Sequence, residues 1–204
     1  MKKNYMDIAL DDYARMLKGM ASTVFSSRKN MITVFHGSTS LFEEIDVAKG
    51  KPYKDFGRGF YVTHNFNHAK NIALRNQKLE IKRYSKEVGT YLYTYDFDLQ
   101  TAKTKCRIRD FALADREWFE FILANRKSKG CAHDFDIVLG PTADDDTRDV
   151  LNLYSMGVYG EVGSTLAKET AVRLLEVDNL PTQVFFATPL ATQFLTRKGE
   201  VKIL

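Results

Sequence analysis

Two short segments place a ring-bearing side chain next to backbone that carries no side chain. In residues 34–38 (Val-Phe-His-Gly-Ser) a β-prone run ends in a His-Gly pair. In residues 55–63 (Asp-Phe-Gly-Arg-Gly-Phe-Tyr-Val-Thr) two glycines flank an arginine, and a strand-forming run follows. Glycine lets a chain turn sharply or lie against a ligand, whereas Phe, Tyr and Val favour strands. Each segment therefore predicts a strand that holds one ring beside open backbone.

Two later segments carry oxygen-bearing side chains. Residues 140–145 (Gly-Pro-Thr-Ala-Asp-Asp) follow an apolar run, and Gln183 opens another one. The acidic residues 144–146 could face a ribose or an acceptor, but acidic side chains are also favourable at the start of a helix. Because residues 148–156 are compatible with a helix, we favour the second interpretation, and we assign no metal.

Composition limits the class of protein. The chain has 204 residues, of which 44% are apolar, so a sizeable core is expected and general disorder is not. Its net charge of +4 arises from 30 basic and 26 acidic residues that are interspersed, which does not by itself imply nucleic acid. Cys106 and Cys131 are too few for a disulfide framework and are expected to be ordinary thiols. Without a secretory signal or an apolar membrane span, we expect a soluble, cytoplasmic protein.

Periodicity predicts an α+β domain. Residues 1–30 are expected to form an N-terminal helix and a connector, with a possible partner-binding role, before a main domain at 31–204. Strands are expected at 31–36, 59–63, 90–98, 135–139, 183–187 and 198–203. Helices are expected from Asn65 or Asn67 to about 83, and at 110–127, 148–157, 164–175 and 189–194. Trp118 and its aromatic neighbours are expected in the core.

Four blocks in order resemble a bacterial family of unknown function that is assigned to the ADP-ribosyltransferase-like clan. The blocks are residues 36–38 (His-Gly-Ser), residues 55–63, residues 140–145, and Gln183 with Phe186 and Thr188. Residues 56–61 are also similar to the Phe-Gly-Lys-Gly-Ile-Tyr block of the poly(ADP-ribose) polymerases. The resemblance covers about residues 31–196, and four ordered blocks are a more specific signal than any one of them.

The resemblance implies the ADP-ribosyltransferase-like fold, with two small, mostly antiparallel sheets forming a split core between flanking helices. It implies NAD as co-substrate, nicotinamide as leaving group, and transfer of ADP-ribose to a protein, a nucleic acid or a small molecule. His36 would bind the adenosine ribose, Gly37 the nicotinamide carboxamide through its backbone, and Tyr61 the nicotinamide ring. The implied catalytic residues are His36, Tyr61 and Gln183. The implied NAD-binding residues are His36, Gly37, Ser38, Arg58, Gly59, Tyr61, Thr63 and Ile72.

Two positions depart from the polymerase pattern. Gln183 stands where a carboxylate would stabilise the oxocarbenium-like state that forms as nicotinamide leaves. Losing such a group commonly costs about 2.7–4 kcal/mol, so Gln183→Glu is expected to raise NAD hydrolysis if charge is the missing ingredient. Ile72 stands where the polymerases have a second tyrosine, which leaves an aliphatic wall beside the nicotinamide.

Other interpretations of these residues remain open. The chain could be a binding module for NAD or an ADP-ribose ligand without turnover, or an RNA 2′-phosphotransferase, although only Arg58 is well placed for a phosphate. His36 and Tyr61 could be structural residues, and Gln183 could be a solvated strand residue. His133 lies near Cys131, but further metal ligands are lacking.

Overall fold

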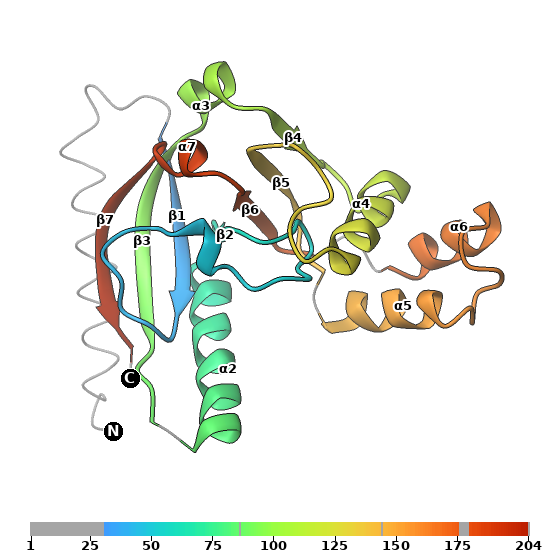
Figure 1. Cartoon of the computed structure of the whole chain (residues 1–204), viewed down its shortest axis with the longest axis horizontal. Helices are drawn as coiled ribbons and strands as arrows, with labels where there is room; N and C mark the ends of the chain where they lie inside the picture. The colour runs from blue at the N-terminus through green and yellow to red at the C-terminus, as the bar shows by residue number, and fades with distance from the viewer. Residues whose placement is uncertain (1–30, 86, 144, 176–179, 204) are drawn as a thin grey trace, which may run out of the picture. The chain divides into compact units, whose positions relative to one another are not determined.

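The computed structural model of the chain describes residues 31–85, 87–143, 145–175 and 180–203. Within these residues, seven strands form one sheet in the order β4-β5-β6-β2-β1-β3-β7 (Figure 1). The strands are β1 (Met31–Ser38), β2 (Phe60–Thr63), β3 (Tyr91–Asp98), β4 (Ile108–Asp110), β5 (Ile137–Pro141), β6 (Thr182–Phe186) and β7 (Leu195–Lys202). The N-terminal helix and connector that we predicted for 1–30, and the possible partner site there, lie outside the described residues.

The sheet is mixed and continuous. The pairs β2–β6, β5–β6 and β3–β7 are antiparallel, whereas β4 and β5 are parallel. Phe35 of β1 pairs with Thr63 of β2 and joins the β1–β3–β7 half to the β2–β6–β5–β4 half. We expected two small sheets, and this expectation is corrected to one, because the short strand β2 pairs with β6 along its whole length and still pairs with β1.

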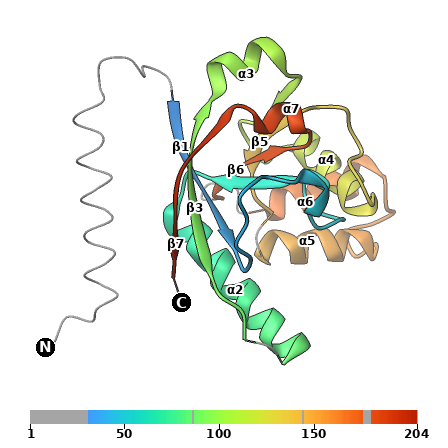
Figure 2. The ribbon, with the colours of Figure 1, turned by 60° about the vertical axis from the view of Figure 1, so that its left-hand side comes forward.

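Helices fill most of the connections between strands. They are α2 (Phe66–Tyr84), α3 (Leu99–Lys105), α4 (Arg116–Lys127), α5 (Asp145–Ser155), α6 (Thr165–Leu174) and α7 (Pro189–Thr192), and a short 3₁₀ turn, η1 (Val47–Lys49), precedes β2. In Figures 1 and 2, α4, α5 and α6 gather beside the β5–β6 half of the sheet, away from β3 and β7. No helix among the described residues is both long enough and apolar enough to cross a membrane.

Side-chain caps decide where several helices begin. The Asn65 side chain accepts a hydrogen bond from His68 N (3.0 Å), so α2 starts at Phe66. The Asp115 carboxylate accepts one from Trp118 N (2.9 Å), which starts α4 six residues later than we predicted. The residues before that cap include β4, which we did not predict. Helix α5 begins at Asp145, which agrees with the helix start that we favoured for this acidic segment.

The core lies on both faces of the sheet. On β6, Phe185 belongs to one buried cluster, whereas Val184 and Phe186 belong to another, because successive strand residues point to opposite faces. The α4-side cluster includes Phe56, Phe111, Trp118, Phe119, Ile122, Val138 and Phe185. The opposite-face cluster includes Val34, Phe60, Val62, Tyr93, Phe97, Ile137, Val184 and Phe186. The expected core position of Trp118 is confirmed, since its side chain is fully buried.

Candidate functional site

The loop before β2 is fastened at three backbone atoms. Phe56 N donates to Tyr61 Oη (3.1 Å), and the same hydroxyl donates to Gly57 O (2.7 Å). His133 Nε2 lies 2.8 Å from Phe56 O, and Phe135 N donates to His133 Nδ1 (3.1 Å). His133 Nδ1 must therefore be the acceptor and Nε2 the donor, which requires a neutral ring. Burial lowers the pKa of His133 and favours that neutral form.

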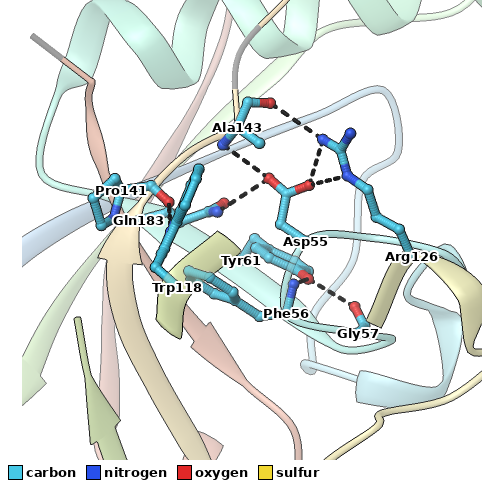
Figure 3. A network of polar contacts seen from close by, with 9 residues as sticks. All are labelled: Asp55, Phe56, Gly57, Tyr61, Trp118, Arg126, Pro141, Ala143 and Gln183. Atoms are coloured by element: carbon cyan, nitrogen blue, oxygen red, sulfur yellow. Dashed lines mark hydrogen bonds and ion pairs between the residues drawn. The ribbon is translucent and has the colours of Figure 1, made fainter. Parts of the chain in front are cut away.

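Asp55, in this loop, joins the loop to α4, to the segment just after β5 and to β6 (Figure 3). Arg126 of α4 donates to Asp55 Oδ1 through Nε (2.9 Å) and Nη2 (2.8 Å). The other carboxylate oxygen, Oδ2, accepts from Ala143 N (3.1 Å), just after β5. It also accepts from Gln183 Nε2 (3.3 Å), on β6. The Asp55 and Arg126 side chains are 15% and 23% exposed, so this ion pair is largely shielded from water.

Tyr61 and Gln183 lie on the same face of the sheet. Tyr61 pairs with Phe185 and Thr63 pairs with Gln183 across β2 and β6, and alternate residues of a strand share a face. The Tyr61 ring contacts the Phe185 ring, with 4.8 Å between their centroids. Burial, and then the Asp55 charge, raise the pKa of Tyr61 well above its ordinary value. The phenol is therefore a neutral hydrogen-bond donor at physiological pH.

His36 lies on the other side of β2. Its ring packs on Phe60, with 4.3 Å between centroids, and Phe60 points away from the face of its neighbour Tyr61. His36 Nδ1 is 2.7 Å from Tyr61 O, and because a carbonyl only accepts, Nδ1 carries the proton and Nε2 is an acceptor. Burial lowers the pKa of His36 to about 4. The structure thus brings Tyr61, Gln183 and Asp55 together, and it connects His36 to them through the backbone.

The two glycines of the predicted site are required by packing. A Cβ on Gly37 would lie 2.0 Å from Ala69 O, because α2 lies directly against β1 there. A Cβ on Gly59 would lie 2.4 Å from the Phe185 ring. Ile72 is on the same helix as Ala69 and is partly buried. The bare backbone at Gly37 therefore faces a helix on the side where a Cβ would point.

The remaining predicted residues bond to nearby backbone. Thr63 Oγ1 donates to Thr182 O (3.0 Å), and Ser38 Oγ accepts from Ser40 N (3.0 Å). Arg58 donates from Nε to Gly50 O (3.0 Å) and from Nη2 to Ala48 O. These three side chains shape the loops around β1 and β2.

Sequence reasoning missed Asp55, Arg126 and His133 as members of the site. Asp55 belongs to the second block, but its partners lie 71 and 128 residues away, so no local spacing indicates them. His133 was considered only as a metal ligand. Cys131, two residues before His133, is a free thiol, as is Cys106. A surface hollow at the start of α4, lined by Asp115, Arg116, Glu117 and Glu120, contains none of the predicted residues.

The fold and site define a mixed α+β domain with a shielded Asp–Arg–Gln network beside a strand tyrosine. The chain belongs to the DUF3990 family, a family of proteins of unknown function, whose profile matches residues 32–196. No curated protein matches the chain, and no solved structure does.

Proposed function

We propose that this protein is an NAD-dependent mono-ADP-ribosyltransferase-like enzyme with an ADP-ribosyltransferase-like fold. The observation that carries the proposal is the position of Tyr61 and Gln183 on paired strands, on one face, beside a shielded carboxylate. These strands belong to the second and fourth of the blocks that resemble the ADP-ribosyltransferase-like clan. An aromatic ring next to an amide oxygen suits a flat leaving group attached to a ribose.

Each side chain then has a defined task. The Tyr61 ring orients the nicotinamide, and Gln183 Oε1 accepts a hydrogen bond from a hydroxyl of the adjoining ribose. The bond between the nicotinamide nitrogen and the anomeric carbon breaks, nicotinamide leaves with the bonding electrons, and an acceptor nucleophile attacks that carbon. His36 supports Tyr61 by donating to its carbonyl, so we assign His36 a positioning role on the strand.

A binding module without turnover is the second candidate, and one observation favours it. The carboxylate that binds Gln183, that of Asp55, is paired with Arg126, so its charge is compensated. A compensated carboxylate stabilises a developing positive charge less than a free one does. NAD or an ADP-ribose ligand would then bind and stay intact.

Titration calorimetry with NAD tests both candidates, and nicotinamide release separates them. We expect heat on NAD addition and an increase in unfolding free energy of about 2.7 kcal/mol when NAD is at 100 times its dissociation constant. Release of nicotinamide then identifies an enzyme, and binding without release identifies a module. If neither heat nor stabilisation is observed with NAD or with ADP-ribose, both candidates are refuted.

A further inference from the structure

The hydrogen bonds of Asp55 determine how the Gln183 carboxamide is oriented. Asp55 Oδ1 accepts twice from Arg126, and Oδ2 accepts from Ala143 N and Gln183 Nε2. An ionised carboxylate only accepts hydrogen bonds, so Gln183 must present its nitrogen to Asp55. Its Oε1 is thereby turned away from Asp55. Gln183 is only 9% exposed, which restricts the side chain further.

We propose that Asp55 is a positioning residue that fixes Gln183 with Oε1 as the hydrogen-bond acceptor for the ribose hydroxyl. This inference rests on the proposed function and extends it to a residue outside the strands. The carboxylate also polarises the amide it binds, which makes Oε1 a stronger acceptor in this shielded site. The negative group of the site is thus supplied by the loop before β2 and acts through the glutamine.

Replacing the Asp55 carboxylate by an amide reverses the orientation of the Gln183 carboxamide. In Asp55→Asn, the two donors of Arg126 hold the new amide oxygen, so the new amide nitrogen faces Gln183. Gln183 must then turn its Oε1 toward position 55 and its nitrogen toward the ribose. The site loses its acceptor and presents a donor, although the overall shape is unchanged.

The same reasoning reverses the effect expected for Gln183→Glu. In the wild-type background, the new carboxyl would lie about where Gln183 Nε2 lies, 3.3 Å from Asp55 Oδ2, and two carboxylates at that distance repel. In the Asp55→Asn background, the amide nitrogen at position 55 donates to the new carboxyl, whose second oxygen is again an acceptor for ribose. Gln183→Glu should therefore reduce activity in the wild-type background and restore it in the Asp55→Asn background.

A four-variant cycle tests this reversal: wild type, Asp55→Asn, Gln183→Glu and the double variant. Urea unfolding without NAD measures stability, and nicotinamide release together with NAD affinity measures function. We expect each single variant to lose on the order of 100-fold in kcat/KM, and the double variant to regain at least about tenfold over Asp55→Asn. Ala143 N loses its acceptor equally in Asp55→Asn and in the double variant, so that loss cancels in the comparison.

Asp96→Asn is the matched control. Asp96 is on β3, is 13% exposed and is paired with Lys198, which is 26% exposed, so it resembles Asp55 in burial and pairing. In the Asp96→Asn background, Gln183→Glu should be as harmful as it is in wild type. If Gln183→Glu is as harmful in the Asp55→Asn background as in wild type, and wild type turns over or binds NAD, the inference is overturned. The proposed function is then unaffected.

A second measurement covers the case in which Asp55→Asn does not fold. Carbon-13 NMR of Gln183→Glu, without NAD, reports the pKa of the new carboxyl. We expect it to lie at least about one unit above the usual value of roughly 4.3, because of the neighbouring Asp55. An ordinary pKa would overturn the inference. Absence of NAD binding to wild type would instead remove the proposed function, whatever this pKa is.

Discussion

At the scale of single residues, the partly buried imidazole of His36 couples folding to pH. The unfolded chain protonates this residue near its ordinary pKa of 6.5, whereas burial lowers the folded pKa to about 4. Between these values the unfolded state binds more protons, so the free energy of unfolding decreases as the pH decreases. The hydrogen bond from Nδ1 to Tyr61 O opposes the shift but does not cancel it.

We predict that His36 alone removes roughly 3 kcal/mol of stability as the pH is lowered from about 6.5 to 4. Urea unfolding of wild type and of His36→Gln at several pH values checks this, because carboxylates titrate equally in both chains. The stability difference should favour wild type at pH 7 and shrink below pH 6. A difference that stays constant with pH would contradict the prediction.

Residue types were predictable here, but residue partners were not. Tyr61 and Gln183 were singled out from their blocks, and the structure brings them to one face of the sheet. Asp55 stands in the same block as Tyr61, yet its role depends on Arg126 and Gln183, which only the fold brings near. The phenol of Tyr61 binds two backbone groups of the preceding loop, a contact that strand periodicity does not indicate.

At the scale of elements, α2 rests on β1 at a point of backbone contact. An added Cβ at Gly37 would lie 2.0 Å from Ala69 O and 3.1 Å from Ala73 N. These are backbone atoms of a 19-residue helix, which cannot move aside as a flexible side chain can. Gly37 therefore determines how closely the helix approaches the strand.

We predict that Gly37→Ala destabilises the fold by about 3 kcal/mol or more, because the helix must shift away from the sheet. Gly199→Ala is the matched control, since Gly199 is also in a strand and nothing lies within 4 Å of the added carbon. Its effect should stay within about 1 kcal/mol. Equal losses of unfolding free energy for the two substitutions would show that the close contact between Gly37 and α2 does not determine stability.

Local signals located most elements but not their ends. Of the two caps that we predicted, Asn65 and Asn67, the structure uses Asn65, because its side chain accepts from the backbone of the first turn. The start of α4 was misplaced because Phe111 and Ala114 continue the apolar pattern of the helix, although they pack in the core from the irregular segment before α4. Strand β4 is only three residues long and pairs in parallel with β5, so its formation depends on a partner 29 residues later.

At the scale of the whole molecule, β6 ties the two buried clusters into one unit. Phe185 packs in the α4-side cluster, and Val184 and Phe186 pack in the opposite-face cluster. The strand cannot leave the sheet without exposing both. An α+β class was predictable from the order of the elements, but the single sheet was not, because the pair Phe35 and Thr63 that joins its halves has no sequence signature.

We predict that the described domain unfolds in one cooperative step. Trp118 is the only tryptophan of the chain and reports the α4-side cluster, whereas far-ultraviolet circular dichroism reports all elements. The two signals should give the same urea midpoint within error. A fluorescence transition that precedes the loss of ellipticity would mean that the helices α4 to α6 detach before the sheet unfolds.

Arg58 lies between two glycines, where a motif search would place a phosphate ligand. Its guanidinium donates to the carbonyls of Ala48 and Gly50 and so connects the preceding turn to the segment before β2. In this chain the arginine therefore has a structural task, and a Gly-Arg-Gly sequence does not by itself establish a phosphate site.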